Sequence, residues 1–187
     1  EVKCPMLGAN IIDNATGKPY FKPYTIINKN GIRIAVIGML TPAIPNWLEE
    51  RLWKGLHFDD IVKSATYWVK YVQDNEAPDL IVGLFHSGWE GGIQTSEYKE
   101  DEAKDVAQKV PGFDVILFGH DHTPHNSVVI GPTGKDVLCL DPANNAIRVA
   151  QADITYKKGD DGKYVIAAKS GKLVDVRPVT PDSAYTA

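Results

Sequence analysis

The sequence of 187 residues predicts an α/β fold built as stacked layers. Through the middle of the chain, nearly continuous apolar runs of strand length alternate with segments of helical periodicity, a pattern typical of parallel strands joined by crossover helices. Beyond residue 125, short β-type runs are separated by Gly, Pro and Asn. Hydrophobic residues make up 43% of the chain, which suits one domain with a sizeable core.

A β-hairpin and a helix come first in the predicted order. The stretch YTIINKNGIRIAVIGM has apolar residues on both sides of Asn30 and Gly31, a pair that favours a tight turn with positive backbone dihedrals. The second arm, Ile32–Met39, is nearly continuously apolar, as a strand covered on both faces should be. Over Asp59–Glu76, apolar residues recur at helical spacing and two acids precede them, so we expect a helix there.

The next elements are predicted as a strand over Leu80–Phe85, a helix over Glu97–Lys109 and a strand over Asp114–Gly119. This order of strand, helix, strand, helix and strand indicates parallel strands with right-handed crossovers. We expect the runs after residue 125 to form antiparallel strands, one of them beside the first sheet. Residues 178–187 are expected to be a linker or a frayed end.

The composition excludes several classes of protein. The formal net charge is −4, and neither Lys nor Arg clusters along the chain, which argues against binding to a nucleic-acid polymer. No apolar run approaches the roughly 20 residues of a membrane-spanning helix. Cys4 and Cys139 lie far apart in sequence, so neither a disulfide framework nor a Cys-rich zinc site is predicted. The chain begins EVKCPMLGANII without an initiator methionine, and we expect it to be a piece of a longer protein.

Three of the five histidines follow the predicted buried strands. His86 comes directly after one strand, and His120 and His122 come directly after another. Because the carboxyl ends of parallel strands meet at one edge of a sheet, we expect these side chains to converge. Neutral imidazole is a ligand that Zn, Mn, Fe and Ni accept, so this edge is a candidate site for a divalent metal. Within GHDH, Gly119 leaves the backbone room to turn.

Other candidate residues each have a structural alternative. His125 is either close to the substrate or part of a solvated loop. Trp89 either stacks on a substrate ring or forms a lid that packs shut. Glu90 is a candidate general acid or base, although a loop carboxylate in water is the simpler interpretation. His57 is interpreted as a surface or packing residue. Ser87 lies outside any G-x-S-x-G nucleophile elbow, and GWEGG lacks the Lys and Ser/Thr of a P-loop.

The motifs FHSGWEGG and VPGFDVILFGHDH are together similar to the second half of the calcineurin-like metallophosphoesterase domain. The order and spacing of PMLGANI, PYTIINKNGIRIAVIGMLTP and AIRVAQADI resemble the branch of 5′-nucleotidases and 2′,3′-cyclic-nucleotide 2′-phosphodiesterases. The resemblance covers about residues 4–157. It implies a layered α/β/β/α sandwich from which the N-terminal part is missing, so that residues 1–187 form a partial domain.

The resemblance also implies a centre of two divalent ions, Mn, Zn or Fe, with roles for matching residues only. His86 and His120 correspond to ligands of one ion and His122 to a ligand of the other, whereas Asp121 has no ligand role. The family's Asp-x-His, Gly-Asp and Gly-Asn-His-Glu motifs are absent from the sequence, and the family's catalytic His is lost with them. The C-terminal domain that grips the nucleoside is absent too. The family suggests a periplasmic or extracellular location.

These implications lead to one expectation and two alternatives. We expect a fragment of an enzyme that hydrolyses nucleotide phosphomonoesters or cyclic phosphodiesters through a water activated by two metals. The fragment alone should bind metal weakly and hydrolyse little or nothing. A divergent single-metal hydrolase that uses His86, His120 and His122 is one alternative. A non-catalytic binding or scaffold module is the other. An exposed sheet edge left by the missing half should promote self-association.

Overall fold

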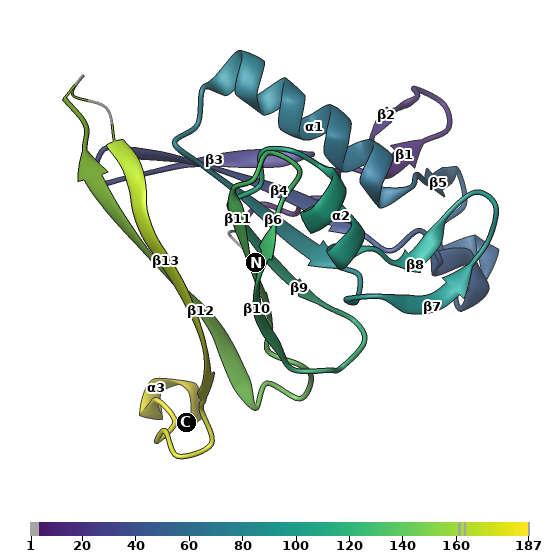
Figure 1. Cartoon of the computed structure of the whole chain (residues 1–187). Helices are drawn as coiled ribbons and strands as arrows, with labels where there is room; N and C mark the ends of the chain where they lie inside the picture. The colour runs from purple at the N-terminus through teal and green to yellow at the C-terminus, as the bar shows by residue number, and fades with distance from the viewer. Residues whose placement is uncertain (1–3, 161, 163, 187) are drawn as a thin grey trace.

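A mixed six-stranded β-sheet forms the centre of the computed structural model, which describes residues 4–160, 162 and 164–186. Residues 1–3, 161, 163 and 187 of the predicted domain lie outside the described residues. From one edge to the other, the strands of the sheet are β10 (His125–Ile130), β11 (Asp136–Asp141), β9 (Val115–Gly119), β6 (Leu80–His86), β4 (Ile32–Leu40) and β3 (Tyr24–Lys29). Strands β4, β6 and β9 are parallel neighbours, as the sequence predicts (Figure 1).

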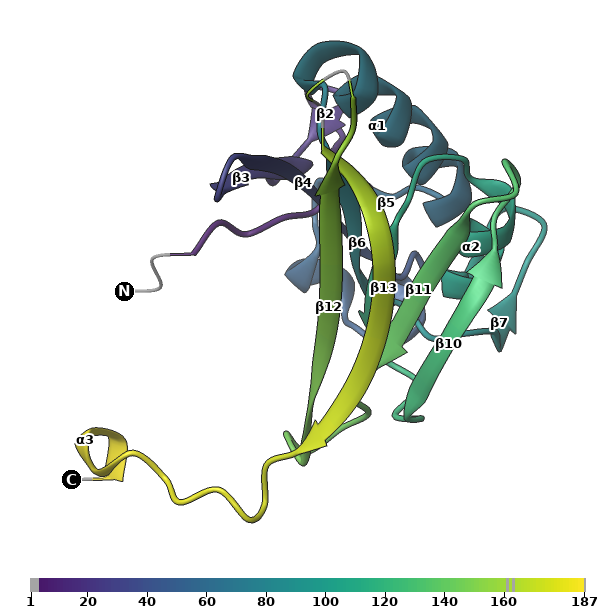
Figure 2. The ribbon, with the colours of Figure 1, turned by 60° about the vertical axis from the view of Figure 1, so that its left-hand side comes forward.

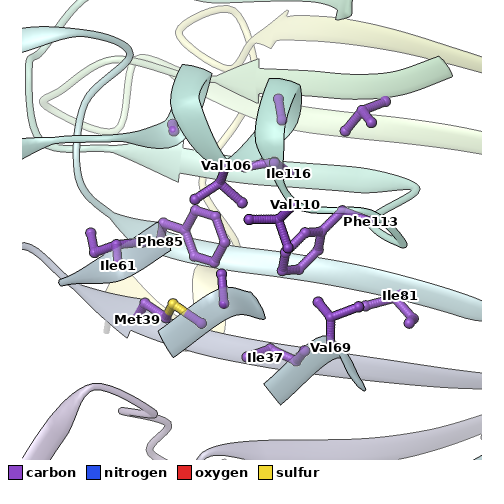
Figure 3. Packing of buried hydrophobic residues seen from close by; sticks show 14 of the residues in the cluster. Ile37, Met39, Ile61, Val69, Ile81, Phe85, Val106, Val110, Phe113 and Ile116 are labelled. Carbon is purple, nitrogen blue, oxygen red and sulfur yellow. The ribbon is translucent and has the colours of Figure 1, made fainter. Parts of the chain in front are cut away.

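Two helices, α1 (Ile61–Glu76) and α2 (Ala103–Lys109), cover one face of this sheet (Figure 1). Apolar side chains from both helices and from the strands beneath them form the main core (Figure 3). Phe85 and Phe113 meet edge to face within it, with ring centroids 5.7 Å apart. The ridge of alternate strand residues that faces the helices includes Ile116 and Phe118. This packing fixes β6 and β9 side by side.

The opposite face of the sheet is partly covered by a long hairpin of β12 (Arg148–Lys158) and β13 (Tyr164–Asp175) (Figures 1 and 2). Val115 and Leu117 alternate with the residues of the main core and pack against this hairpin. An apolar groove of about 540 Å³ remains between the hairpin and β4, β6 and β9. The α/β class and the layered arrangement are therefore confirmed, with helices, sheet and hairpin stacked in that order.

The predicted first hairpin is confirmed. Strands β3 and β4 pair in antiparallel register from Lys29 opposite Ile32 to Tyr24 opposite Ile37. Asn30 and Gly31 have φ values of 51° and 79°, the left-handed conformation that a two-residue turn of this type requires.

The first predicted helix begins two residues later than the sequence pattern indicates. Helix α1 starts at Ile61 because Asp60 is its N-cap, and the Asp60 side chain accepts a hydrogen bond from the Lys63 backbone N–H. The helix ends before Ala77, which takes up a left-handed conformation with φ of 44° ahead of Pro78.

The second predicted helix is wrong over its first six residues. Instead of helix, residues 97–102 contain β8 (Lys99–Asp101), which pairs with β7 (Gly91–Gln94) as an antiparallel hairpin. Tertiary hydrogen bonds explain the difference, since the Glu100 carbonyl accepts from the hydroxyls of Thr41 and Ser87 at the ends of β4 and β6. These bonds hold the backbone extended where helix propensity alone favours a helix.

The strands after residue 125 are not all antiparallel, in contrast to the prediction. Strand β10 is antiparallel to β11, but β11 pairs in parallel with β9, Leu138 lying opposite Val115. The reason is that the chain leaves β9, runs out to the edge as β10 and turns back, so β11 regains the direction of β9. The carboxyl end of β11 therefore lies at the same edge of the sheet as those of β6 and β9.

The remaining elements are peripheral. A small sheet contains β2 (Lys18–Pro19), β1 (Ile11–Asp13) and β5 (Leu56–Phe58), and two short 3-10 helices span 44–46 and 50–52. Residues 178–184 are exposed, and a single helical turn, α3, spans Ser183–Thr186. Among the described residues, no helix combines the length and the apolar character needed to cross a membrane.

Candidate metal centre

His86 and His120 lie side by side at the carboxyl edge of the sheet. His86 is the last residue of β6 and His120 follows the end of β9, where the register sets His86 opposite Gly119. The His86 Nε2 and His120 Nδ1 atoms are 3.3 Å apart, and the two rings meet edge to face with centroids 5.0 Å apart. Parallel strand pairing thus brings together two imidazoles from distant parts of the chain.

His122 belongs to the same edge and acts on His86 electrostatically. The pKa of His86 is lowered mainly by burial, and the neighbouring imidazoles of His120 and His122 lower it further. The His122 side chain is exposed. At neutral pH the His86 ring is therefore neutral, with a lone pair free to bind a cation.

The loop that carries His120 and His122 has an unusual backbone. Both residues have positive φ values, 107° for His120 and 60° for His122, where L side chains are rarely found. Asp121 between them holds this conformation, because its carboxylate accepts 2.8 Å hydrogen bonds from the backbone N–H groups of Trp89 and Thr123. Gly88 permits this approach, since a Cβ there would lie 2.7 Å from the Cβ of Asp121.

Glu100 is a contact of the site that the sequence did not indicate. Its Oε1 atom lies 2.8 Å from His120 Nε2, and its Oε2 atom accepts a 2.6 Å hydrogen bond from the Ile93 backbone N–H. Possible ligand atoms of Glu100, Asp101 and His120 all lie within 4.8 Å of one another. The segment EYKEDE was predicted as helix, and nothing in its pattern marks Glu100 as a neighbour of His120.

Asp141 adds a buried carboxyl group next to the GHDH loop. It ends β11, is fully buried, and accepts a 2.6 Å hydrogen bond from the Ala143 backbone N–H. The pKa of Asp141 is raised to about 6, mainly by burial and also by the facing Asp121 carboxylate, while His122 opposes the change. This residue was missed because the sequence pattern did not predict that β11 runs parallel to β9.

The three candidates for substrate contact make packing or surface contacts. The His125 ring lies 4.1 Å from the Trp89 ring and 5.4 Å from the Phe118 ring, measured between centroids, and its Nε2 is 2.7 Å from the Ser127 hydroxyl. Trp89 also stacks on Phe118 and packs against the main core. Glu90 is exposed and forms a salt bridge with Lys104. Trp89 and Glu90 thus make the contacts of their structural alternatives, whereas His125 begins β10 and packs on two aromatic rings instead of lying in a solvated loop.

The predicted surface histidine lies apart from these groups. His57 is exposed, and its ring contacts Asn14 and Asp59 near the small sheet.

The carboxyl edge of the sheet thus carries three imidazoles with carboxylates close by. Such a donor set suits a borderline divalent cation better than Mg²⁺ or Ca²⁺, which prefer oxygen ligands.

Comparison with known proteins identifies the family of the chain that carries this edge. A sequence model of the calcineurin-like phosphoesterase family matches residues 9–124, a range that contains His86, His120 and His122. The chain belongs to the calcineurin-like phosphoesterase family. The resemblance inferred from the sequence motifs is therefore confirmed.

Individual relatives of this chain include bacterial nucleotidases. It is 34% identical over 131 residues to a 2′,3′-cyclic-nucleotide 2′-phosphodiesterase/3′-nucleotidase of Yersinia enterocolitica and 37% identical over 124 residues to a 5′-nucleotidase of Vibrio cholerae. Each alignment covers 64% of this chain but only 19% and 22% of the respective relative, so the chain spans about a fifth of their length.

Solved structures agree with this assignment. The calcineurin-like phosphoesterase YfkN of Bacillus subtilis superposes with a TM-score of 0.79 at 25% identity, over 96% of this chain and 58% of that one. The sulfate thiohydrolase SoxB of Thermus thermophilus shares the fold, with a TM-score of 0.77 at 23% identity over 98% of this chain and 30% of its own.

Proposed function

We propose that this chain supplies part of the metal centre of a phosphoesterase that hydrolyses nucleotide phosphomonoesters or cyclic phosphodiesters. In this proposal His86 and His120 bind one divalent ion, and His122 contributes to a second. The observation that carries the proposal is the 3.3 Å separation of His86 Nε2 and His120 Nδ1. The names of the bacterial relatives, which are nucleotidases, support the class of substrate.

The two ring nitrogens fit a shared ion. With Zn–N bonds of about 2.0–2.1 Å and tetrahedral angles, two ligand nitrogens lie roughly 3.3–3.4 Å apart. The observed 3.3 Å falls at this value. The lowered pKa of His86 also keeps its nitrogen unprotonated, as a ligand must be.

A bound divalent ion in such a centre supplies Lewis-acid stabilisation of the phosphoryl group and a water nucleophile activated near neutral pH. The residues of this chain orient the imidazoles that would bind the ion. Asp121 fixes the backbone between His120 and His122 through Trp89 and Thr123, and parallel pairing of β6 with β9 fixes His86 beside His120. Three imidazoles are too few for two tight sites, so we expect the chain alone to bind metal weakly and to show little or no hydrolysis.

Metal stoichiometry is the first test. The chain is loaded with Mn²⁺ or Zn²⁺, freed of excess ion and measured by elemental analysis, together with His86→Ala and His120→Ala. His57→Ala is the matched control, because that histidine is exposed and lies near the small sheet. We expect at most one weakly held ion, lost in both site variants and kept in the control. About two tight ions per chain would overturn the incomplete-site argument, and uptake unchanged in all variants would indicate a scaffold.

Turnover by the chain alone is tested separately, by phosphate release from 5′-nucleotides and by formation of nucleoside monophosphates from 2′,3′-cyclic nucleotides. We expect no turnover above that of His120→Ala. Metal-dependent turnover that disappears in His120→Ala would show that this chain is a complete hydrolase, the single-metal alternative.

A further inference from the structure

We propose that Glu100 is a positioning residue that holds the His120 ring with its Nδ1 lone pair directed toward His86. This inference rests on the proposed metal site, which it deepens by naming the group that orients one ligand. With an ion bound, Glu100 and His120 would form a series of carboxylate, histidine and metal, in which the carboxylate fixes the tautomer and the orientation of the ring.

The first argument is the assignment of the two nitrogens of His120. Nε2 lies 2.8 Å from Glu100 Oε1, a distance at which an imidazole N–H donates to a carboxylate. A neutral imidazole carries only one N–H, so a proton on Nε2 leaves Nδ1 with a lone pair. Nδ1 is the atom that lies 3.3 Å from His86 Nε2. The hydrogen bond to Glu100 therefore selects the tautomer that has its ligand atom on the His86 side.

The second argument is that Glu100 itself is firmly held. Its Oε2 accepts a 2.6 Å hydrogen bond from the Ile93 N–H of the partner strand. Its backbone carbonyl accepts 2.9 Å hydrogen bonds from the Thr41 and Ser87 hydroxyls, and both of those residues are fully buried. The backbone of Glu100 is thus fixed to the ends of β4 and β6, the second of which carries His86, and Ile93 holds the carboxylate.

The third argument separates positioning from direct ligation. Nδ1 and Nε2 point away from opposite sides of an imidazole ring, so a carboxylate in line with the Nε2–H cannot share an ion with Nδ1. Each Glu100 oxygen also has a partner already, His120 for one and Ile93 for the other. The side chains of Glu100 and His120 are only 14% and 18% exposed, so water competes weakly for this hydrogen bond.

The experiment records the ring nitrogens of His120 by NMR, with ¹⁵N-labelled histidine, in the metal-free and the Zn²⁺-loaded chain. A His120→Gln spectrum assigns the signals. Glu100→Ala removes the acceptor, Glu100→Gln keeps one acceptor oxygen, and Glu97→Ala is the control because Glu97 is an exposed carboxylate of the same hairpin. Zn²⁺ affinity is measured in parallel by competition with a chelator, and circular dichroism checks that each variant is folded.

We expect a protonated Nε2 and an unprotonated Nδ1 in the wild type, and persistence of the Nε2 proton when Zn²⁺ is bound. Glu100→Ala should give a mixture of tautomers and weaken Zn²⁺ binding about 10- to 100-fold, with partial recovery in Glu100→Gln and no change in Glu97→Ala. A proton on Nδ1 in the wild type, or loss of the Nε2 proton on Zn²⁺ binding, would overturn the inference. If the wild type binds no Zn²⁺, the proposed function fails, and the metal-free tautomers still decide the role of Glu100.

Discussion

The buried carboxyl group of Glu102 should make the stability of this fold fall as the pH rises from acid to neutral. Glu102 is 3% exposed, and its Oε2 accepts a 3.0 Å hydrogen bond from the Ile61 N–H at the start of α1. The pKa of this carboxyl is raised from 4.5 to about 7, mainly by burial and also by repulsion from Asp60. The perturbation that isolates this group is Glu102→Gln, because Gln retains an acceptor oxygen for Ile61 but never ionises.

The sign follows from proton linkage. Between about pH 4.5 and pH 7 the folded chain keeps a proton on Glu102 that the unfolded chain has lost, so each rise in pH favours unfolding. A difference between pKa values of 4.5 and about 7 corresponds to about 3 kcal/mol. That stability is fully present below pH 4.5 and is lost once the pH passes 7.

The assay is urea unfolding, followed by tryptophan fluorescence, of the wild type and Glu102→Gln across this pH range. The buried Gln amide adds a cost that does not vary with pH, so the informative quantity is the change in the difference between the two proteins. We expect Glu102→Gln to gain about 3 kcal/mol on the wild type from below pH 4.5 to above pH 7. Glu97→Gln, at an exposed site, should show no such gain. A difference that stays constant with pH would refute the reasoning.

Three further predictions concern packing, capping and association. Ile116→Ala removes a fully buried side chain from the main core and should cost about 2–5 kcal/mol in urea unfolding, whereas a loss under about 1 kcal/mol would mean that the core collapses around the gap. Asp60→Ala removes the N-cap of α1 and should cost about 0.5–2 kcal/mol, with Asp60→Asn close to the wild type in the same assay. Ile27 lies on edge strand β3 and is 48% exposed. We therefore expect dimers or larger species in sedimentation at high concentration, and Ile27→Lys should shift them toward monomer. A wild type that stays monomeric would contradict self-association.

Strands and their order were predictable where local pattern and tertiary environment agree. Continuous apolar runs identified β4, β6 and β9, and the Asn30–Gly31 turn fixed the first hairpin, because each choice depends on a few neighbouring residues. The placement of His86 beside His120 followed from parallel pairing alone. The prediction succeeded because strand register determines which residues meet at the edge of the sheet.

The unpredicted parts depend on contacts between distant residues. The segment around Glu100 has helix-forming composition, and the buried hydroxyls of Thr41 and Ser87, together with pairing to β7, hold it as a strand. The parallel direction of β11, and with it the position of Asp141, depends on where β10 inserts in the sheet. Neither the strand around Glu100 nor the direction of β11 produces a periodic pattern in the sequence, so local sequence patterns cannot predict them.

The backbone conformation of His120 and His122 costs stability, so selection for thermostability should disfavour histidine at both positions. Side chains other than Gly cost about 1–2 kcal/mol in the left-handed region, and both histidines occupy it, at φ values of 107° and 60°. A library randomised at these two positions and sorted only for heat resistance should therefore enrich Gly and Asn. The same library sorted for retained Zn²⁺ should enrich His. The two sorted populations would diverge at the residues that the fold strains, so comparing a stability sort with a Zn²⁺ sort would locate functional positions.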